Sequence, residues 1–418
     1  MATKNSVSAQ VSLDEKYQQK TDKEHILDNP DTYIGSIENV SGPMYIYDGK
    51  IIQKDIDYNP ALYKLFDEGI TNCRDHRVRT EIKKKTDDTT DVVTSIHIEI
   101  SNNKITMTNN GDGIDIEEHP TYKIWIPELI FAHLRTSTNY NKEEQKTTGG
   151  KNGFGFKLVL IWSIWGEIET VDAKRQLKYH QVFENNLDIV HKPKITACKK
   201  NPYTRVSFIP DYKRLGLEGL SDNMLKLFQR RVYDIAGITT KDVKVKYNED
   251  LLPVKDFGQY IQLFNDQDKV SESHDCWSYS VCLSDEFKQV SFVNGIFTSK
   301  GGKHVDYIIQ QITKKMGAYI LKKKKIEVKP SIIKEQITIF LNSTIVNPSF
   351  DSQTKDYLNT PASKFGSACL VSDKFIEKLA SLGVLNTSCE LSEVKEKKES
   401  KKNRWCKNKN DSRCFKVN

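Results

Sequence analysis

Residues 148–157, TGGKNGFGFK, place four glycines and two lysines directly before the apolar run LVLIWSIW at 158–165. Glycine loses more conformational freedom on ordering than any other residue, so such a cluster marks a tight turn or a close approach to a ligand. A glycine-rich loop that opens a helix is typical of phosphate binding. A surface loop leading into a buried helix is the alternative, and this stretch alone does not separate the two.

Length and composition exclude several protein classes. The 418 residues allow two or three domains. The longest apolar run is far shorter than the roughly 20 residues that cross a bilayer, and the first 20 residues lack the apolar core of a signal peptide. The eight cysteines form no CxxC pair, so we expect neither a disulfide framework nor a zinc site. These features favour an intracellular protein without contact to a membrane.

Positive charge is unevenly distributed along the chain. The net charge is +7, and lysines concentrate at 321–330 and 395–404. Such runs can bind polyanions, although a solvated helix face or a basic tail explains them equally well. The run KKESKKNR near the C-terminus fits a nuclear signal, a linker, or neither.

Hydrophobic periodicity predicts alternating helices and strands. Residues 1–20 read as a polar extended arm, and a composition shift indicates a domain boundary near residue 245. We expect helices at 22–29, 59–78, 125–140 and 303–325, and one more within the apolar run 158–165. The first of these helices is ended by Asn29-Pro30 and followed by a turn. Strands are expected at 92–101, 104–114, 166–173, 177–185, 204–212, 278–285, 289–298 and 336–345.

Three polar residues lie at positions where they can act together. Glu68 and Asn72 are four residues apart and therefore share one face of the predicted helix. A carboxylate and a carboxamide so placed can hold a water molecule and a Mg²⁺ ion side by side. Asn109 ends a predicted strand before a Gly-x-Gly turn, where its amide can read an adenine edge. The alternatives are an exposed helix charge, a surface amide and an ordinary hairpin turn.

The order of these motifs resembles the ATP site of the GHKL superfamily. The segments SFVNGIFTSKGGKHVDYI (291–308) and NPSFDSQTKDYL (347–358) resemble the transducer of type IIA DNA topoisomerases, specifically of the eukaryotic branch. Within that branch, the resemblance suggests a viral source. The motifs at 23–36, 134–140 and 232–245 are similar to that branch too. The resemblance implies an α+β protein, with a GHKL (Bergerat) ATPase α/β sandwich at 21–245 and a transducer of ribosomal-protein-like βαβ fold at 246–390. An N-terminal strap at 1–20 and a basic linker or truncated tail at 391–418 complete it.

The resemblance also assigns roles to residues, with ATP and Mg²⁺ as cofactors. Glu68 matches the general base that activates water, and Asn72 matches the side-chain Mg²⁺ ligand. Gln353 and Lys355 match the loop that reaches the γ-phosphate, so both are expected to be catalytic. The expected ATP contacts are Tyr17, Asn72, Asn109, Ser137, Thr138, Asn139, Gly150, Lys151, Asn152, Gly153, Phe154, Gly155, Phe156, Lys157, Gln353 and Lys355.

The expected partners follow from the same resemblance. Tyr17 matches a strap residue that reaches the partner subunit, which implies a homodimer induced by nucleotide and closed around double-stranded DNA. Lys322, Lys323, Lys324 and Lys325 match a loop that touches the DNA. No Asp-x-Asp centre or cleavage tyrosine domain follows, so we expect an N-terminal fragment that works with a C-terminal cleavage core of the same polypeptide.

The sequence departs from the family pattern at two places, and two alternative functions remain open. CRDH follows Asn72 where relatives carry small residues and Asn, and Phe156 is bulkier than the usual alanine. An ATP-gated DNA clamp without hydrolysis, or a GHKL chaperone-like protein, would carry part of the same pattern. The compartment would be the host cytoplasm for a viral protein and the nucleus for a cellular one.

Overall fold

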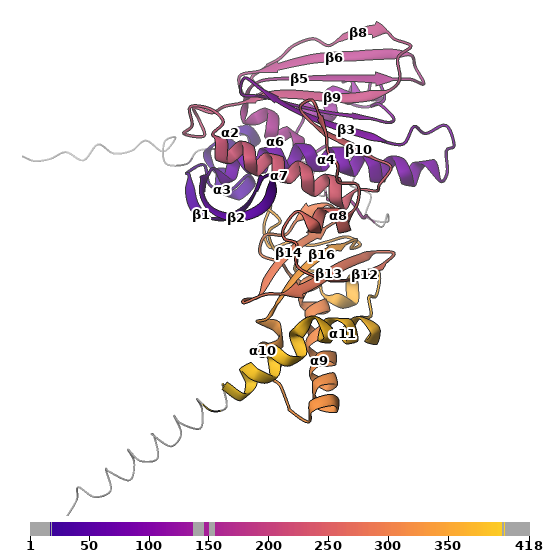
Figure 1. The fold of residues 1–418 in the computed structure, drawn as a ribbon. Coiled ribbons are helices and arrows are strands. Elements are labelled where there is room, and N and C mark those ends of the chain that lie inside the picture. Colours follow the sequence, from indigo (N-terminus) through magenta and orange to yellow (C-terminus); the bar gives the residue numbers. More distant parts are fainter. Residues whose placement is uncertain (1–16, 18, 137–145, 150–154, 395–396, 398–418) are drawn as a thin grey trace, which may run out of the picture.

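The chain forms two lobes stacked along one axis (Figure 1). This computed structural model describes residues 17, 19–136, 146–149, 155–394 and 397. The first lobe holds a large sheet with helices beneath it, and the second holds a smaller sheet with helix α9 (Lys303–Lys324) on its far side. Within the described residues, no helix is both long enough and apolar enough to cross a membrane.

A mainly antiparallel sheet organises the first lobe. In the described part of the chain its strand order is β11-β10-β3-β4-β9-β5-β6-β7, and β8 also pairs with β6. Among the described strands of this sheet, β10 and β3 form the one parallel pair. The strands are β3 (Ser95–Ser101), β4 (Lys104–Asn110), β5 (Ser163–Asp172), β6 (Leu177–Glu184), β7 (Ile189–Val190), β8 (Lys194–Ala197), β9 (Tyr203–Pro210), β10 (Lys244–Tyr247) and β11 (Asp250–Leu251).

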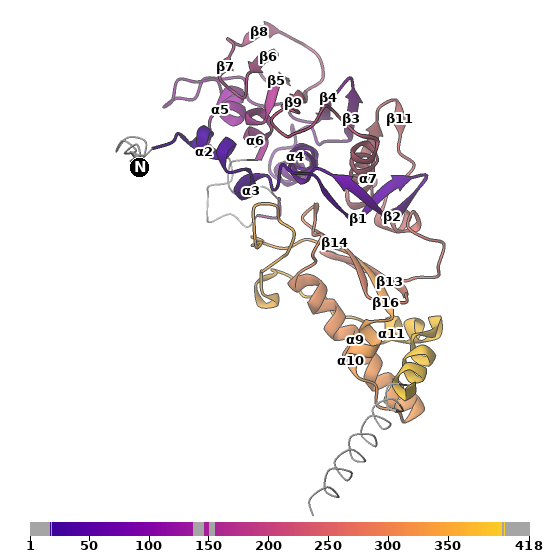
Figure 2. The same cartoon turned by 90° about the vertical axis from the view of Figure 1, so that its left-hand side faces the viewer.

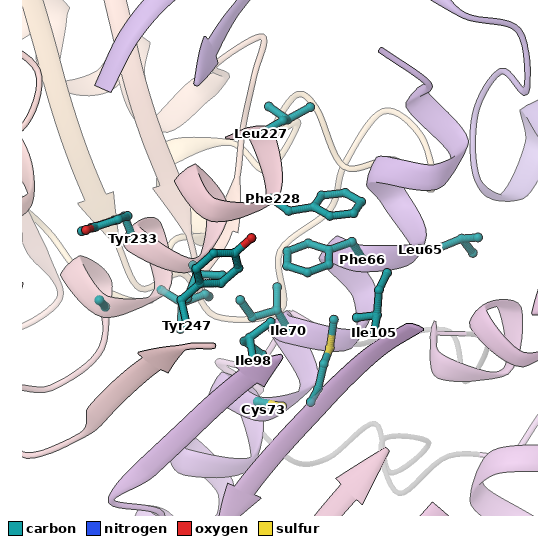
Figure 3. Close-up of a cluster of buried hydrophobic side chains, with 14 of the residues drawn as sticks. Leu65, Phe66, Ile70, Cys73, Ile98, Ile105, Leu227, Phe228, Tyr233 and Tyr247 are labelled. Carbon is teal, nitrogen blue, oxygen red and sulfur yellow. The ribbon is translucent and has the colours of Figure 1, made fainter. Parts of the chain in front are cut away.

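Two long helices join this sheet to the rest of the lobe. Helix α4 (Pro60–Lys84) begins where Asn59 accepts a hydrogen bond from the Leu62 amide and Pro60 occupies the first turn. Helix α7 (Asp222–Ile238) lies beside it, and the rings of Phe66 and Phe228 stack at 4.1 Å between them. Figure 3 shows these rings above Ile98 and Ile105 of the sheet, so the core lies between the helix pair and the strands.

Smaller elements complete the first lobe. The hairpin of β1 (Val40–Asp48) and β2 (Lys50–Tyr58) packs against α7. Four short helices lie around the sheet or at the junction of the lobes: α2 (Asp22–Asp28), α3 (Pro30–Tyr33), α5 (Ile126–Ala132) and α6 (Gly155–Ile161).

A βαβ unit forms the centre of the second lobe. Strands β14 (Lys288–Val293) and β16 (Ile337–Ser343) pair in parallel, and helix α9 lies in the connection between them, as parallel pairing requires. The remaining elements of this part are α8 (Phe257–Gln262), β12 (Val270–His274), β13 (Trp277–Leu283), β15 (Ile296–Phe297), α10 (Pro330–Lys334), η1 (Ala362–Lys364), α11 (Asp373–Leu379) and η2 (Ala380–Val384).

The structure differs from the sequence-based expectations at several places, and the helix expected at 125–140 ends at Ala132. The run 158–165 is not one helix, because α6 ends at Ile161 and β5 begins at Ser163. Pro30 begins helix α3 instead of a turn, since its fixed φ suits a first helical position. Residues 289–298 form two strands, because Asn294 and Gly295 have φ of 51° and 82° and make a two-residue turn. Strands β10 and β11 extend the first sheet to Leu251, beyond the expected boundary at 245.

Candidate active site

A cavity of about 400 Å³ lies between α4, α6, the sheet and a loop of the second lobe. Its size is that of a small-molecule site. The lining side chains divide into an apolar group, which includes Met107, Ile130, Phe131 and Val206, and a polar group contributed chiefly by α4 and the second lobe. Eight of the residues predicted from sequence line it: Glu68, Asn72, Asn109, Gly155, Phe156, Lys157, Gln353 and Lys355.

One face of helix α4 supplies the polar wall of the cavity. Glu68, Asn72, His76 and Arg79 follow each other at spacings of four, four and three residues, which places them in one stripe. The Asn72 amide nitrogen donates to the Glu68 carbonyl oxygen at 2.8 Å, so the Asn72 Oδ1 stays available to another ligand. Burial lowers the pKa of His76 to about 4, and its Nε2 lies 2.7 Å from the Asp112 carbonyl oxygen, so this ring is neutral near pH 7.

The Glu68 carboxylate lies between two ammonium groups. Its Oε1 is 2.8 Å from the Lys64 Nζ and 3.1 Å from the Lys355 Nζ. Only 5% of Glu68 is exposed. Burial by itself raises the pKa of this carboxyl, but Lys355 and Lys64 overcome it and lower the pKa to about 2. Glu68 is therefore ionised and fixed at one oxygen by groups from both lobes.

The loop that carries Lys355 holds this residue in a left-handed backbone conformation. Its φ is 64°, which costs about 1–2 kcal/mol for a residue with a Cβ. The loop is tied down nearby, because Ser299 Oγ donates to Asp356 Oδ1 at 2.6 Å and Thr354 Oγ1 donates to its Oδ2 at 2.9 Å. Residual strain next to a buried ion pair is typical of a functional contact.

The start of α6 closes the cavity next to Glu68. A Cβ added at Gly155 would lie 3.1 Å from Glu68 Oε2, so a larger residue would crowd the Glu68 carboxylate. The Lys157 Nζ donates to the Thr136 carbonyl oxygen at 2.7 Å, and burial lowers the pKa of Lys157 to about 8. The other predicted members of this region lie outside the described residues: Ser137, Thr138, Asn139, Gly150, Lys151, Asn152, Gly153 and Phe154.

Asn109 lines the cavity from the end of strand β4. It is 5% exposed, and its amide nitrogen donates to the Asn110 carbonyl oxygen at 2.9 Å, which leaves Oδ1 as its acceptor. Gly113 of the following turn packs on β5, where an added Cβ would lie 1.8 Å from the Val171 carbonyl oxygen. This glycine is required by packing against the strand.

The structure keeps two other predicted groups away from the cavity. Tyr17 is 71% exposed and does not line it. Lys322, Lys323 and Lys324 end helix α9, and Lys325 follows them at its left-handed C-cap with φ 61°. All four are exposed, and Figure 2 shows the end of α9 on the side of the second lobe opposite the first.

Sequence reasoning missed four charged residues in or next to the cavity. Lys64 lies one helical turn before Glu68, and Arg79 lies on the same stripe beyond His76, so helical spacing could have identified both. Asp67 and Arg231 form an ion pair at 2.6 Å across 164 positions of sequence. Nothing in the local pattern indicates that pair.

Comparisons with known proteins identify relatives along nearly the whole chain. Residues 58–210 match the family "Histidine kinase-, DNA gyrase B-, and HSP90-like ATPase", and residues 241–407 match "DNA gyrase B". The "DNA topoisomerase 2" of Acanthamoeba polyphaga mimivirus is 43% identical over 391 residues, which cover 89% of this chain and 30% of that protein. The chain thus spans under a third of the curated relatives it matches first.

Two solved structures are similar along their full length. The ATPase region of Saccharomyces cerevisiae topoisomerase II superposes with a TM-score of 0.84 at 40% identity, covering 91% of this chain and 100% of that one. The ATPase and transducer domains of DNA topoisomerase II from Balamuthia mandrillaris give a TM-score of 0.85 at 37% identity, covering 92% and 100%. Both the sheet-and-helix first lobe and the βαβ second lobe therefore have counterparts of known fold.

Proposed function

Because this chain belongs to the type II DNA topoisomerases, as their ATPase region, we propose that the cavity binds ATP and hydrolyses it with Glu68 as general base. The observation that supports this most directly is the ionised Glu68 carboxylate at the cavity wall, 3.1 Å from a lysine of the other lobe. A carboxylate fixed in this way can orient a water molecule and accept its proton as the water attacks the γ-phosphate.

In the proposed pose, the two ends of the cavity bind different parts of ATP. Asn109 Oδ1 accepts from the adenine amino group, and the apolar side chains near it contact the ring. Lys157 and the α6 end lie beside the triphosphate, together with the predicted contacts at 137–139 and 150–154. Gln353 and Lys355 reach the γ-phosphate from the second lobe, where the ammonium stabilises the negative charge that develops during transfer.

Magnesium fits the donors of this site. Asn72 offers one uncommitted side-chain oxygen, and a hard cation of this kind takes few protein ligands and completes its shell with phosphate oxygens and water. Among the described residues, no cluster of three or more His, Cys, Asp or Glu side chains forms a separate metal centre. When bound, Mg²⁺ would neutralise phosphate charge, while Asn72 orients it next to Glu68.

We further propose that Lys355 exchanges partners during the cycle. Its ammonium contacts Glu68 in the structure, and the oxygens of a terminal phosphate would compete for that same group. Binding of ATP then moves a contact between the lobes from a carboxylate to the nucleotide, and hydrolysis releases it. The two lobes correspond in this proposal to an ATPase domain at 21 to about 252 and a transducer up to about 390, flanked by the strap at 1–20 and a basic tail.

Dimerisation, DNA contact and strand passage belong to a longer enzyme, of which the relatives give the length. We propose a homodimer induced by nucleotide, with Tyr17 reaching the partner, closed around double-stranded DNA that Lys322–Lys325 contact through phosphates. DNA strand passage would need the cleavage core that the longer relatives suggest. The mimivirus relative supports a source among large DNA viruses, of the African swine fever virus kind, with the host cytoplasm as compartment; a cellular source would place the protein in the nucleus.

Steady-state ATP hydrolysis by the 418-residue chain and its Glu68→Gln variant tests the base. We expect kcat to fall by at least about 100-fold, since general-base catalysis contributes about 10²–10⁴, with binding of a non-hydrolysable ATP analogue retained. Glu81→Gln is the matched control, because Glu81 lies on the same helix with its side chain 48% exposed. Equal hydrolysis by parent and Glu68→Gln would refute the base, and no hydrolysis by either would favour an ATP-gated clamp.

A further inference from the structure

The turn between β14 and β15 inserts into the first lobe beside the candidate active site. Asn294 anchors the turn in its own lobe, because its amide nitrogen donates to Ile345 O and its Oδ1 accepts from Ile345 N, both at 2.8 Å. A Cβ added at Gly295 would lie 2.8 Å from Arg74 of α4, and one at Gly149 would lie 2.9 Å from Ile296. The hairpin therefore contacts both α4 and the residue that begins the glycine loop.

Arg231 joins this turn to helix α4. Its guanidinium is fully buried and donates from Nε to Asp67 Oδ1 at 2.6 Å. Its Nη2 donates to Thr71 Oγ1 at 3.1 Å and to the Gly295 carbonyl oxygen at 2.8 Å. A planar guanidinium can satisfy acceptors in several fixed directions at once, whereas a lysine ammonium on the same stem cannot.

The contacts continue from Asp67 to the proposed base. Lys64 Nζ lies 3.4 Å from Asp67 Oδ2 and 2.8 Å from Glu68 Oε1, so one ammonium is shared by both carboxylates. Lys64, Asp67 and Glu68 are each under 10% exposed. Charges buried together interact strongly, so losing one partner redistributes the others. Released from Arg231, Asp67 would draw Lys64 away from Glu68.

We propose that Arg231 is a positioning residue for ATP hydrolysis: it fixes the transducer turn at Gly295 against α4 and, through Asp67 and Lys64, holds the Glu68 carboxylate in place. This inference rests on the proposed function, since it needs Glu68 to act as the base. The transducer then contacts Glu68 by two routes, directly through Lys355 and indirectly through Arg231.

The preceding residue offers a matched control. Arg230 is also fully buried on α7, and it contacts the same hairpin, with its guanidinium 4.0 Å from the centre of the Phe297 ring. Its Nε pairs with Asp234 at 3.0 Å, on its own helix. Arg230 therefore shares burial, charge and hairpin contact with Arg231, and both pair with Asp234, at 3.0 and 3.7 Å, but Arg231 pairs in addition with Asp67. A purely structural role would make the two lysine variants equivalent.

The experiment compares Arg231→Lys with Arg230→Lys in the 418-residue chain. It measures kcat and KM for ATP, the Kd of a non-hydrolysable ATP analogue, and the thermal unfolding midpoint. We expect Arg231→Lys to lower kcat by about 10–100-fold, since misplacing a reacting group by about 1 Å can cost that much, with the analogue Kd within about threefold of the parent. Arg230→Lys should keep kcat within about threefold at a similar loss of unfolding midpoint.

Each other outcome has a definite meaning. A kcat loss in Arg231→Lys no larger than in Arg230→Lys at equal midpoint refutes positioning. If Arg231→Lys does not fold, Thr71→Val removes one acceptor of the same guanidinium, and an unchanged kcat in that variant overturns the proposal. Glu68→Gln distinguishes a failure of the proposed base from a failure of the positioning role. If Glu68→Gln still hydrolyses ATP, the proposed base role of Glu68 is wrong. If Glu68→Gln is inactive while Arg231→Lys matches the parent, only the positioning role of Arg231 is wrong.

Discussion

The two lobes contact each other at two places with opposite properties. The hairpin contact at Gly295 is buried from solvent, because Arg231 is entirely buried and three hydrogen bonds fix its guanidinium. The loop contact at Lys355 lies on the wall of the cavity, and its ion pair to Glu68 depends on a residue in a strained left-handed conformation. One contact has no access to a ligand, whereas the other faces the space that a ligand would fill.

We call the buried hairpin contact at Gly295 the pivot and the loop contact at Lys355 the switch, because the two contacts are expected to respond differently to nucleotide. A buried arginine that loses its partners leaves an uncompensated charge, so we expect the hairpin contact to persist when nucleotide binds. A lysine at a cavity wall can exchange one anion for another with little penalty, because both partners satisfy the same ammonium. We therefore expect nucleotide to act on the Lys355 contact while the Gly295 contact keeps the lobes in register.

Replacing Lys355 gives the largest expected effect on this comparison. Lys355→Ala removes the exchangeable contact, and kcat should fall by about 100-fold or more, as when one group that stabilises transition-state charge is lost. The unfolding midpoint should change little. Lys300→Ala is the control, since Lys300 is 68% exposed and pairs only loosely with Asp356 at 3.6 Å. A Lys355→Ala variant with parental kcat would show that the loop contact takes no part in hydrolysis.

Replacing Gly295 perturbs the pivot. Gly295→Ala places a Cβ 2.8 Å from Arg74 at a φ of 82°, so strain of about 1–2 kcal/mol adds to the crowding. We expect a lower free energy of unfolding in denaturant titration. Gly49→Ala is the matched variant, because Gly49 also has a positive φ of 72° but nothing within 4 Å. Equal losses in both variants would mean that the hairpin does not press on α4.

These two contacts also mark the limit of what the sequence could predict. Periodicity predicted α4, α9 and the β3–β4 hairpin, because each is a local pattern with its own turn or cap. Helical spacing placed Glu68 and Asn72 on one face, where the structure has them. The pairing of Arg231 with Asp67 depends on how α7 packs against α4, which no short stretch encodes. The two-strand split at Asn294–Gly295, in contrast, is signalled by the Asn-Gly pair itself, which the expected single strand at 289–298 overlooked.

Acid stability gives the smallest and most local test, at the base of the Lys355 loop. His304 is fully buried where α9 begins, next to the Gly302–Leu358 bridge that anchors this loop. Burial lowers the pKa of His304 to about 3, below the 6.5 of an unfolded chain. The unfolded state therefore binds the extra proton, so stability is fully present above pH 6.5 and is lost as the pH falls, by about 1.4 kcal/mol per pH unit for this one residue. His304→Gln should flatten the slope of unfolding free energy between pH 6.5 and 5 by about that amount. An unchanged slope in His304→Gln would mean that this ring is solvated before the chain unfolds, and that the anchor of the switch opens independently of the pivot.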